Sequence, residues 1–380
     1  MAGYDRLYFL KKAWPLYPGI TRPVSAGFLA AHYHRRSAER GPLRTVADAL
    51  TGIAFRAWIP WRAAKVQRKF GLDAAWRKRA IAIARARFAD PNDIALFRIC
   101  SPDQLDLYIR RFEDAALNKQ VNPRGWTTDC ALADKRLFAE RCREAGLPHA
   151  ETIAVADRGD VRILSDPAGR TVVAKPAQGE GGDGVQMLGA VPDEEKLIGR
   201  LRTMRGAVLV QPLISVHPDL MYLALNALPT VRIVTILDEA DVPEVVSATF
   251  RCASKPEARV DNMKAGGLIS AVDLADGTLG TACYGYGGGD HEVHPRTGAR
   301  ITGRPLPDWD KAKALVIRAH QDAFADYVIV GWDVALTPDG PILIEGNGKP
   351  GVLMPQRAAR QGLGAGRYGL LYAHHLATKT

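Results

Sequence analysis

The stretch that decides the fold is GWDVALTPDGPILIEGN, at residues 331–347. An apolar and largely β-branched run over residues 328–336 leads into Pro338-Asp339-Gly340. Because Pro fixes φ near −65° and Gly accepts a positive φ, this triplet has the chemistry of a tight turn. A second apolar run, at residues 341–344, follows the turn. The stretch therefore predicts a β-hairpin.

Three residues with oxygen ligands stand on this hairpin. Glu345 and Asn347 are two positions apart on the second strand, so their side chains share a face, and Asp333 on the first strand is within reach of it. Mg²⁺ uses such hard oxygen ligands when it also bridges substrate phosphates. The three residues therefore predict a Mg²⁺ site. Two polar residues at a strand end beside a solvated Asp would give the same pattern.

A second stretch, at residues 171–188, combines a lysine with a glycine-rich loop. The run Thr171–Pro176 predicts a strand that carries Lys175 near its end, and AQGEGGDG follows at 177–184. These glycines fit the dinucleotide pattern G-x-G-x-x-G, but that pattern needs a helix to begin at the third glycine. Residues 185–188 are instead a short apolar run, typical of a strand. The stretch therefore predicts a flap whose backbone N–H groups can close over phosphates, with Lys175 supplying a charge.

Further short segments follow in a fixed order across residues 125–355. With their spacing they make the sequence resemble the ATP-grasp superfamily, and it is most similar to the sugar-transfer-associated ATP-grasp family. Residues 1 to 115 carry no motif of the superfamily. The matching segments are Asp134-Lys135, Lys175-Pro176, Thr230-Val231-Arg232, Asp261-Asn262 with Gly266-Gly267, His294-Pro295 with Thr297-Gly298, Gly331-Trp332-Asp333 and Glu345-Gly346-Asn347.

The resemblance implies an α+β chain, with an ATP-grasp fold preceded by a basic helical N-terminal domain, and ATP and Mg²⁺ as cofactors. In the family the strand at 207–214 is the hinge whose backbone contacts the adenine. Family members commonly have an acidic residue there, where this chain has Gln211, so Asp219 is expected to contact the ribose instead. Arg232 is alone on an apolar strand and needs an anion; the resemblance implies a phosphoryl oxygen.

The resemblance assigns the site residues as follows. Catalytic roles are expected for Arg232 and Lys175, and metal binding for Asp333, Glu345 and Asn347. Contacts to the substrate are expected from Asn262, Gly267 and His294. Contacts to ATP are expected from Lys135, Lys175, Glu180, Gly181, Gly182, Gln211, Leu213 and Asp219.

The activity that the resemblance implies is ATP-dependent ligation of a carboxylate to an amine through an acyl phosphate, with release of ADP and phosphate. The substrates would be glycan-related or secondary metabolites. One alternative is a phosphotransferase acting on a sugar hydroxyl, which needs a general base such as His294 or Asp261. The other is a nucleotide-binding partner of glycan assembly without catalysis, although the full set of lysines and metal ligands favours an enzyme.

Composition and charge set wider bounds. The 380 residues predict two or three structural units, and 47% hydrophobic with 24% charged residues is typical of a soluble globular protein. No run of 18 apolar residues occurs, as a membrane-spanning helix would need. The five cysteines are scattered without a C-x-x-C pair, which predicts buried thiols in a reducing cytoplasm. Without a recognised module, no nucleic-acid partner is expected.

The excess positive charge is confined to the N-terminal part. Residues 1–120 hold 22 Lys and Arg against 10 Asp and Glu, a net charge of +12, whereas the whole chain carries +10. We therefore expect a basic helical domain at 1–120 and an ATP-grasp domain at 121–380, with a flap subdomain at about 150–212. One expected helix, over 45–69, has an apolar face of Ile53, Ala57, Trp58, Trp61 and Ala64.

Such basic amphipathic helices can lie on anionic membranes, so a cytoplasmic protein with peripheral membrane contact is one expectation. An ordinary helical domain with solvated or paired arginines is the other.

Overall fold

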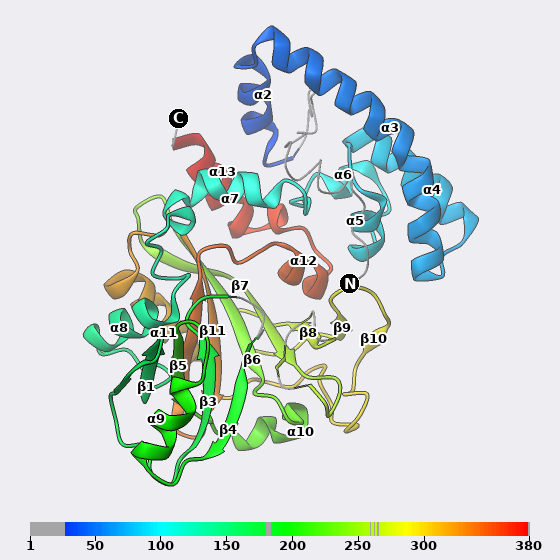
Figure 1. Cartoon of the computed structure of the whole chain (residues 1–380). Coiled ribbons are helices and arrows are strands. Elements are labelled where there is room, and N and C mark those ends of the chain that lie inside the picture. Colours follow the sequence, from blue (N-terminus) through cyan, green and yellow to red (C-terminus); the bar gives the residue numbers. More distant parts are fainter. Residues whose placement is uncertain (1–26, 180–183, 259, 262, 264–265, 379–380) are drawn as a thin grey trace.

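The computed structural model of the chain describes residues 27–179, 184–258, 260–261, 263 and 266–378. It contains a seven-stranded sheet, a five-stranded sheet and an N-terminal group of helices, which is coloured blue to cyan in Figure 1. The helical group and the five-stranded sheet lie toward opposite ends of the molecule (Figure 1). This is the α+β architecture with a helical N-terminal region that the sequence predicts.

The larger sheet has the strand order β10-β9-β8-β7-β6-β11-β12, and each neighbouring pair is antiparallel. Every residue of the central strands β6 and β11 is buried. Helices cover both faces, which explains why most residues of these strands are apolar. The strands are β6 (Thr230–Leu237), β7 (Pro243–Cys252), β8 (Leu268–Ala271), β9 (Ala282–Tyr284), β10 (Asp290–His291), β11 (Ile329–Thr337) and β12 (Gly340–Asn347).

Strands β11 and β12 confirm the predicted hairpin. Asp333 lies opposite Glu345, and Gly331 lies opposite Asn347. Gly340 has a φ of +110°, as the turn requires. Because β12 runs on to Asn347, all three predicted metal ligands stand within the paired part of the hairpin.

The smaller sheet has the order β2-β1-β5-β3-β4, and its apolar side packs on helix α9. Strands β3 and β4 pair antiparallel on either side of the glycine loop, so the predicted strand, loop and strand are confirmed. The elements are β1 (Ala154–Asp157), β2 (Asp160–Ile163), β3 (Thr171–Pro176), β4 (Gln186–Ala190), β5 (Val208–Pro212) and α9 (Glu194–Arg202).

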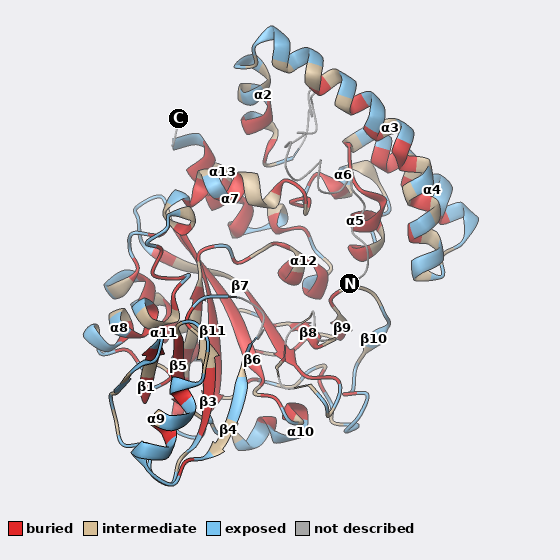
Figure 2. Cartoon of the chain, in the orientation of Figure 1, coloured by how far each residue is buried: buried red, intermediate tan, exposed pale blue. Residues whose placement is uncertain are grey.

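The N-terminal helices α3 to α6 build a core of their own. Phe55, Ile59, Trp76 and Ile83 are among its buried members. Figure 2 shows buried segments on these helices in red. Helix α3 begins with Pro42 in its first turn and ends at Gly71, whose φ is +63°. The helices are α2 (Ala30–Ala38), α3 (Pro42–Phe70), α4 (Ala74–Arg87), α5 (Pro91–Leu96), α6 (Pro102–Leu105) and α7 (Asp114–Val121).

One detail of the predicted helix at 45–69 was wrong. Trp58 is buried in the helical core, whereas Ile53 and Trp61 are exposed. Counting at 100° per residue, apolar residues occupy two opposite sides of α3, and the prediction merged them into one face. One side packs on the neighbouring helices, and the other faces solvent.

Helices α2 and α7 join this region to the rest of the protein through a second core. Leu29 and Leu117 pack there with Val234 and Ile329 of the large sheet and with Tyr372 of the last helix. The remaining helices are α8 (Lys135–Glu144), α10 (Met221–Ala224), α11 (Trp309–Ala323), α12 (Leu353–Ala359) and α13 (Arg367–Thr378), with 3₁₀ turns at Pro123–Trp126, Pro218–Leu220 and Leu363–Ala365. Among the described residues, no helix is both long and apolar enough to cross a bilayer.

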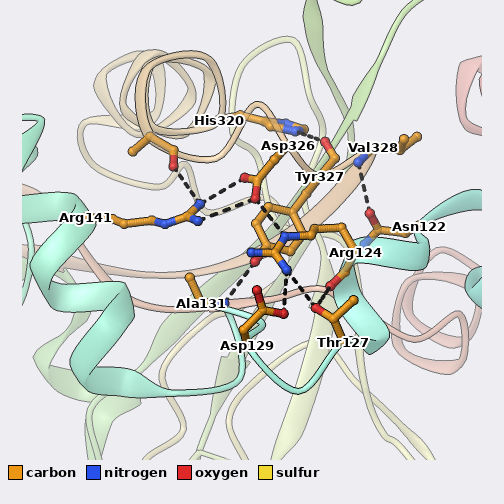
Figure 3. A network of polar contacts seen from close by, with 11 residues as sticks. Asn122, Arg124, Thr127, Asp129, Ala131, Arg141, His320, Asp326, Tyr327 and Val328 are labelled. Carbon is orange, nitrogen blue, oxygen red and sulfur yellow. Dashed lines mark hydrogen bonds and ion pairs between the residues drawn. The ribbon is translucent and has the colours of Figure 1, made fainter.

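A polar network fixes the chain where it passes from α7 toward α8 (Figure 3). The Asp326 carboxylate accepts from Arg124 Nε at 3.0 Å and from Arg141 Nη1 at 2.9 Å. Asn122 accepts from the Val328 N–H at 2.9 Å through its Oδ1, and the Tyr327 hydroxyl accepts from the Ala131 N–H at the same distance. These contacts hold the segment against the connection between α11 and β11, and so fix the position of α8.

Candidate active site

A cavity of about 970 Å³ lies between the two sheets, where β3, β5 and α8 face β6, β7 and the β11–β12 hairpin. The wall formed by the small sheet and the segment after β5 is mostly apolar. The floor, formed by the large sheet, carries Arg232, Asp333 and Glu345. The cavity also reaches the N-terminal helical region through Arg111 and Asp114. Predicted site residues in its lining are Lys135, Lys175, Leu213, Arg232, Asp333, Glu345 and Asn347.

Two buried arginines hold the carboxylate of Asp333. Arg232 lies directly opposite Asp333 on the neighbouring strand and donates to both carboxylate oxygens, with Nη2 at 3.0 Å from Oδ2. Arg251 Nη2 also lies 3.0 Å from Oδ2. Burial alone would raise the pKa of Asp333, but the two guanidinium groups outweigh it and hold the pKa well below its ordinary value. Asp333 is therefore a permanent anion at the cavity floor.

Glu345 behaves in the opposite way. Burial, and next the neighbouring carboxylate of Asp333, raise the pKa of Glu345, while Lys135 opposes the shift. Two carboxylates that face each other in a buried place repel when both are ionised. A cation between them would relieve this repulsion.

This donor set fits Mg²⁺. Asp333, Glu345 and Asn347 all line the cavity and offer hard oxygens. Asn347 Nδ2 donates to the Gly331 carbonyl at 3.3 Å, which leaves its Oδ1 for another partner. Because Asp333 is already shared by two arginines, Glu345 and Asn347 are the ligands with fewer competing contacts.

Both predicted lysines stand at the cavity. Lys135 Nζ donates to the Gly179 carbonyl at 2.9 Å and lies 3.8 Å from Glu345 Oε2. Lys175 Nζ donates to Gln211 Oε1 at 2.8 Å. Burial lowers the pKa of Lys175, and Glu345 partly opposes this effect. Asp134 fixes the position of Lys135 because it caps α8 by accepting from the Arg136 N–H.

The ends of the glycine loop are shaped for glycine. Gly179 has a φ of +116° and Gly184 a φ of +78°, a region that other residues rarely adopt. A Cβ on Gly184 would also lie 2.8 Å from Pro176 Cγ. The predicted contacts Glu180, Gly181, Gly182 and Asn262 lie outside the described residues.

Several other predicted site residues do not line the cavity. Gln211 is buried, and its Nε2 donates to the Ala150 carbonyl at 3.2 Å. Its Oε1 accepts from Lys175, so Gln211 contacts a residue of the cavity without lining it. Asp219 is exposed on the turn at Pro218–Leu220. Gly267 is buried just before β8.

His294 supports a turn in the structure. Its Nε2 lies 2.7 Å from the Ala253 carbonyl, and its Nδ1 accepts from the backbone N–H groups of Arg296 and Thr297, each at 3.3 Å. Both ring nitrogens are therefore engaged, and the side chain is almost fully buried. Leu213 does line the cavity, but its backbone N–H donates to the Thr171 carbonyl at 2.8 Å, so only its side chain and carbonyl remain for a ligand.

Sequence reasoning missed Arg251. It donates to Thr230 Oγ1 at 2.6 Å through Nη2, and its Nε lies 3.3 Å from Asp261 Oδ2. Burial raises the pKa of Asp261, and Arg251 opposes the shift. The signal that could have found Arg251 is the one that found Arg232, a charged residue at the end of an apolar strand.

The cavity also has a far end that the sequence did not indicate. Arg111 lies over the ring of Tyr286, with 5.8 Å between the guanidinium carbon and the ring centre. Lys349 lies over Trp126 at 4.0 Å. Arg111, Tyr286 and Lys349 come from three distant parts of the chain and all line the cavity.

Comparisons with known proteins agree with this architecture. The model of the family described as sugar-transfer associated ATP-grasp matches residues 113–367, which is more than half of the chain. No curated protein matches the sequence.

Solved structures show more distant similarity. The L-amino acid ligase from Bacillus licheniformis is 15% identical over 57% of this chain and 40% of its own, with a TM-score of 0.34. The ATP-grasp ligase PsnB, complexed with precursor peptide PsnA2 and AMPPNP, is 17% identical over 68% and 60%, with a TM-score of 0.37. The D-alanine–D-alanine ligase from Bacillus anthracis is 16% identical over 66% and 68%, also with a TM-score of 0.37. The chain thus spans less than two thirds of the first two proteins.

Proposed function

Because the chain belongs to the sugar-transfer-associated ATP-grasp family, we propose that it is an ATP-dependent carboxylate–amine ligase. The observation that carries the proposal is the meeting of Lys135, Lys175, Arg232, Arg251 and Glu345 in one cavity between two sheets. The two lysines and two arginines surround the carboxylate pair of Asp333 and Glu345. Such a set suits a ligand that carries several phosphate charges together with a divalent metal ion.

We assign the adenine to the apolar wall of the cavity. Val173, Met187 and Ile214 line that wall together with the Leu213 side chain. Apolar walls and a few backbone groups suffice to bind a planar base. Because Asp219 lies away from the cavity, it is no longer our candidate for the ribose contact.

We place the phosphates over Lys135 and Lys175, with their far end toward Arg232 and Arg251. When bound, Mg²⁺ on Glu345 and Asn347, with Asp333 beside them, would supply positive charge between the phosphates. The side chains of the protein then neutralise charge and orient the reactants.

The proposed reaction has two steps. A carboxylate oxygen of the first substrate forms a bond to the γ-phosphorus as the bond to ADP breaks, which gives an acyl phosphate. The amine nitrogen of the second substrate then forms a bond to the acyl carbon, phosphate leaves, and the nitrogen loses a proton. Arg232 and Arg251 stabilise the oxygens of the transferred group, and the flap keeps out water that would hydrolyse the acyl phosphate.

The substrates that we propose are a small-molecule or glycan-linked carboxylate and an amine. The end of the cavity with Arg111 and Lys349 would hold the part of a substrate away from the reacting carbon. Peripheral contact with an anionic membrane is a separate proposal, which rests on helix α3 rather than on this cavity.

A phosphotransferase is the second candidate, and the structure favours it less. It needs a general base, and His294 has both ring nitrogens engaged in a turn. Asp261 remains as the base, but its carboxylate accepts from the Thr230 hydroxyl and pairs with Arg251. The charged floor also disfavours a partner that only binds nucleotide, because such a role needs no buried carboxylate pair.

Product analysis tests the proposal. The protein is incubated with ATP, Mg²⁺, candidate carboxylates labelled with oxygen-18, and candidate amines or hydroxylamine. Amide or hydroxamate formation, with transfer of the label to phosphate and release of ADP, is the expected result. A phosphorylated acceptor would favour the phosphotransferase, and AMP would contradict both. The Glu345→Gln variant serves as the inactive control.

A further inference from the structure

Helix α3 presents a second apolar side that nothing in the described structure covers. Leu43, Val46, Leu50, Ile53 and Trp61 have exposed fractions from 54% to 88%. Their spacing of three, four, three and eight residues places them on one side of the helix. At 1.5 Å per residue this apolar row is roughly 27 Å long.

The row lies opposite the side of α3 that packs inward. Phe55, Ile59 and Val66 fill the helical core, so the exposed row contributes nothing to it. Single exposed apolar side chains are common, but monomeric soluble proteins rarely expose contiguous rows of large ones. In Figures 1 and 2, α3 lies at an outer edge of the molecule, and exposed segments alternate along it with intermediate and buried ones. The row is therefore open to a partner.

The charge next to the row identifies the kind of partner. Most acidic side chains of this region are already in ion pairs: Asp48 with Arg40 and Arg44, Asp90 with Arg62, and Asp106 with Arg87. Several exposed cations remain that form no ion pair within the described part of the chain. They are Lys65, Arg68, Arg77, Lys78, Arg79 and Arg85.

Two of these cations, Lys65 and Arg68, lie on α3 just beyond the last residue of the apolar row. The other four stand on α4, which packs against α3. Lys65 Nζ lies 5.3 Å from the centre of the Trp61 ring. A Trp beside a Lys, between an apolar and a basic surface, suits the boundary between acyl chains and headgroups.

From this juxtaposition we propose that α3 binds the surface of an anionic bilayer. The apolar row enters the acyl boundary, and the cations meet the headgroup phosphates and carboxylates. A soluble polyanion would leave Leu50 and Ile53 without a role. A second copy of this chain would bring two basic surfaces together. The proposal is independent of the ligase activity, because none of these residues lines the cavity.

The experiment measures association of the full chain with vesicles. One set contains phosphatidylserine and phosphatidylcholine in equal parts, and the other contains phosphatidylcholine alone. We expect sedimentation with the first set only, and release as salt rises, because screening shortens the reach of each charge. Equal sedimentation with both sets would overturn the charge part of the proposal, and sedimentation with neither would overturn all of it.

Paired variants separate the two contributions. Leu50→Ser with Ile53→Ser should weaken partitioning by at least about tenfold. Lys65→Glu with Arg68→Glu should weaken it by about fivefold or more for each charge removed, and should flatten the salt dependence. All four side chains are exposed, so thermal unfolding should not change. Vesicle binding that survives both pairs would overturn the assignment to α3.

Matched controls use similar side chains elsewhere. Leu164 and Val242 are about half exposed, on other surfaces, and Leu164→Ser with Val242→Ser should bind vesicles like the unaltered protein. Arg202→Glu with Arg205→Glu removes the same charge from the end of α9. Sedimentation equilibrium tests the other occupant. Suppose that the unaltered protein is a dimer, that Leu50→Ser with Ile53→Ser dissociates it, and that neither protein binds vesicles. The apolar row would then be an interface with a second copy of this chain and not a membrane-binding surface.

Discussion

Arg232 and Asp333 lie directly opposite each other on β6 and β11, and the guanidinium group donates to both oxygens of the carboxylate. Arg251 donates to the same carboxylate at 3.0 Å. Asp333 thus serves two buried cations as well as any metal. Substitutions of Asp333 and of Glu345 should therefore differ in their effect on stability, although the sequence predicted both residues in one metal site.

We expect Asp333→Asn to abolish turnover and also to destabilise the fold. The change leaves two buried guanidinium groups with less negative charge, and breaking a buried ion pair from one side costs about 3 kcal/mol or more. Thermal unfolding with and without Mg²⁺ measures this effect. An unfolding midpoint equal to that of the unaltered protein would show that the arginines do not depend on Asp333.

Glu345→Gln is the cleaner test of the metal site. The side chain keeps its size, and its ion pair with Lys135 is long, at 3.8 Å, so stability should change by less than about 1 kcal/mol. Mg²⁺-dependent turnover should fall by roughly a hundredfold or more. Steady-state rates across a Mg²⁺ titration check this. Full activity at limiting Mg²⁺ would remove Glu345 from the site.

Gln211 and Asp219 provide a matched pair for the ATP site. Gln211 holds the Lys175 ammonium at 2.8 Å, and losing a hydrogen bond to a charged group should raise the KM for ATP by about tenfold in Gln211→Leu. Asp219→Ala should leave the KM for ATP unchanged, because the side chain is exposed away from the cavity. A large effect of Asp219→Ala would restore it as the ribose contact.

The sequence predicted those parts of the fold whose pattern is local. The β11–β12 hairpin carried its own turn, and the flap carried a loop of glycines between two apolar runs. Both were confirmed because backbone preference and hydrophobic pattern point to the same structure there. The two-sided apolar pattern of α3 was misread, because its outer side looks like a core-facing side until the packing is known.

The site was less predictable where it depends on contacts between distant strands. The position of Arg251 beside Asp333 follows from the order of β7, β6 and β11, which local patterns do not specify. His294 was expected to contact the substrate, or to serve as a general base, because the segment His294-Pro295 matches the family. Its structural role in a turn depends on the Ala253 carbonyl, which lies far away in the sequence.

The flap should depend on Gly184. Its φ is +78° and an added Cβ would lie 2.8 Å from Pro176 Cγ, so Gly184→Ala should displace the loop and raise the KM for ATP. Gly189→Ala is the control, because Gly189 also has a positive φ but open space around its Cα. Equal KM values in the two variants would mean that loop position does not matter.

Acid should destabilise the protein through His320. Burial lowers the pKa of this imidazole from 6.5 to about 4. Its Nε2 lies 2.8 Å from the Tyr327 carbonyl and its Nδ1 lies 2.7 Å from Thr235 Oγ1, a pattern that suits the neutral ring. Between pH 6.5 and 4 the unfolded chain therefore binds a proton that the folded chain does not.

The free energy of unfolding should fall with decreasing pH in this window by up to about 1.4 kcal/mol per unit. Above pH 7 the titration of His320 should add nothing to the pH dependence. Denaturant unfolding of the protein and of His320→Asn at several pH values tests this. We expect the variant to be less stable at neutral pH, with a shallower slope. An equal slope in both proteins would assign the acid sensitivity to other groups.

The last prediction concerns the border between the helical region and the rest of the chain. Deleting residues 1–121 should give an insoluble product. Leu117 and Val121 share a core with Val234 and Ile329, so the deletion exposes the outer face of the central strands. It also removes Ile109, whose backbone N–H and carbonyl both bond the buried amide of Gln356 at 2.9 Å. The deletion would expose an apolar sheet face to water and leave Gln356 Nε2 without the Ile109 carbonyl as its acceptor.

Supplying the missing part in trans distinguishes this explanation from general misfolding. Co-expression of residues 1–121 with residues 122–380 should restore solubility and ATP binding, because the two pieces rebuild the shared core. A control piece with Leu117→Asp should not restore either, since it places a charge in that core. If residues 122–380 alone were soluble and unfolded in one cooperative transition, the helices would be an appendage, and the shared core would contribute little to the stability of the ATP-grasp fold.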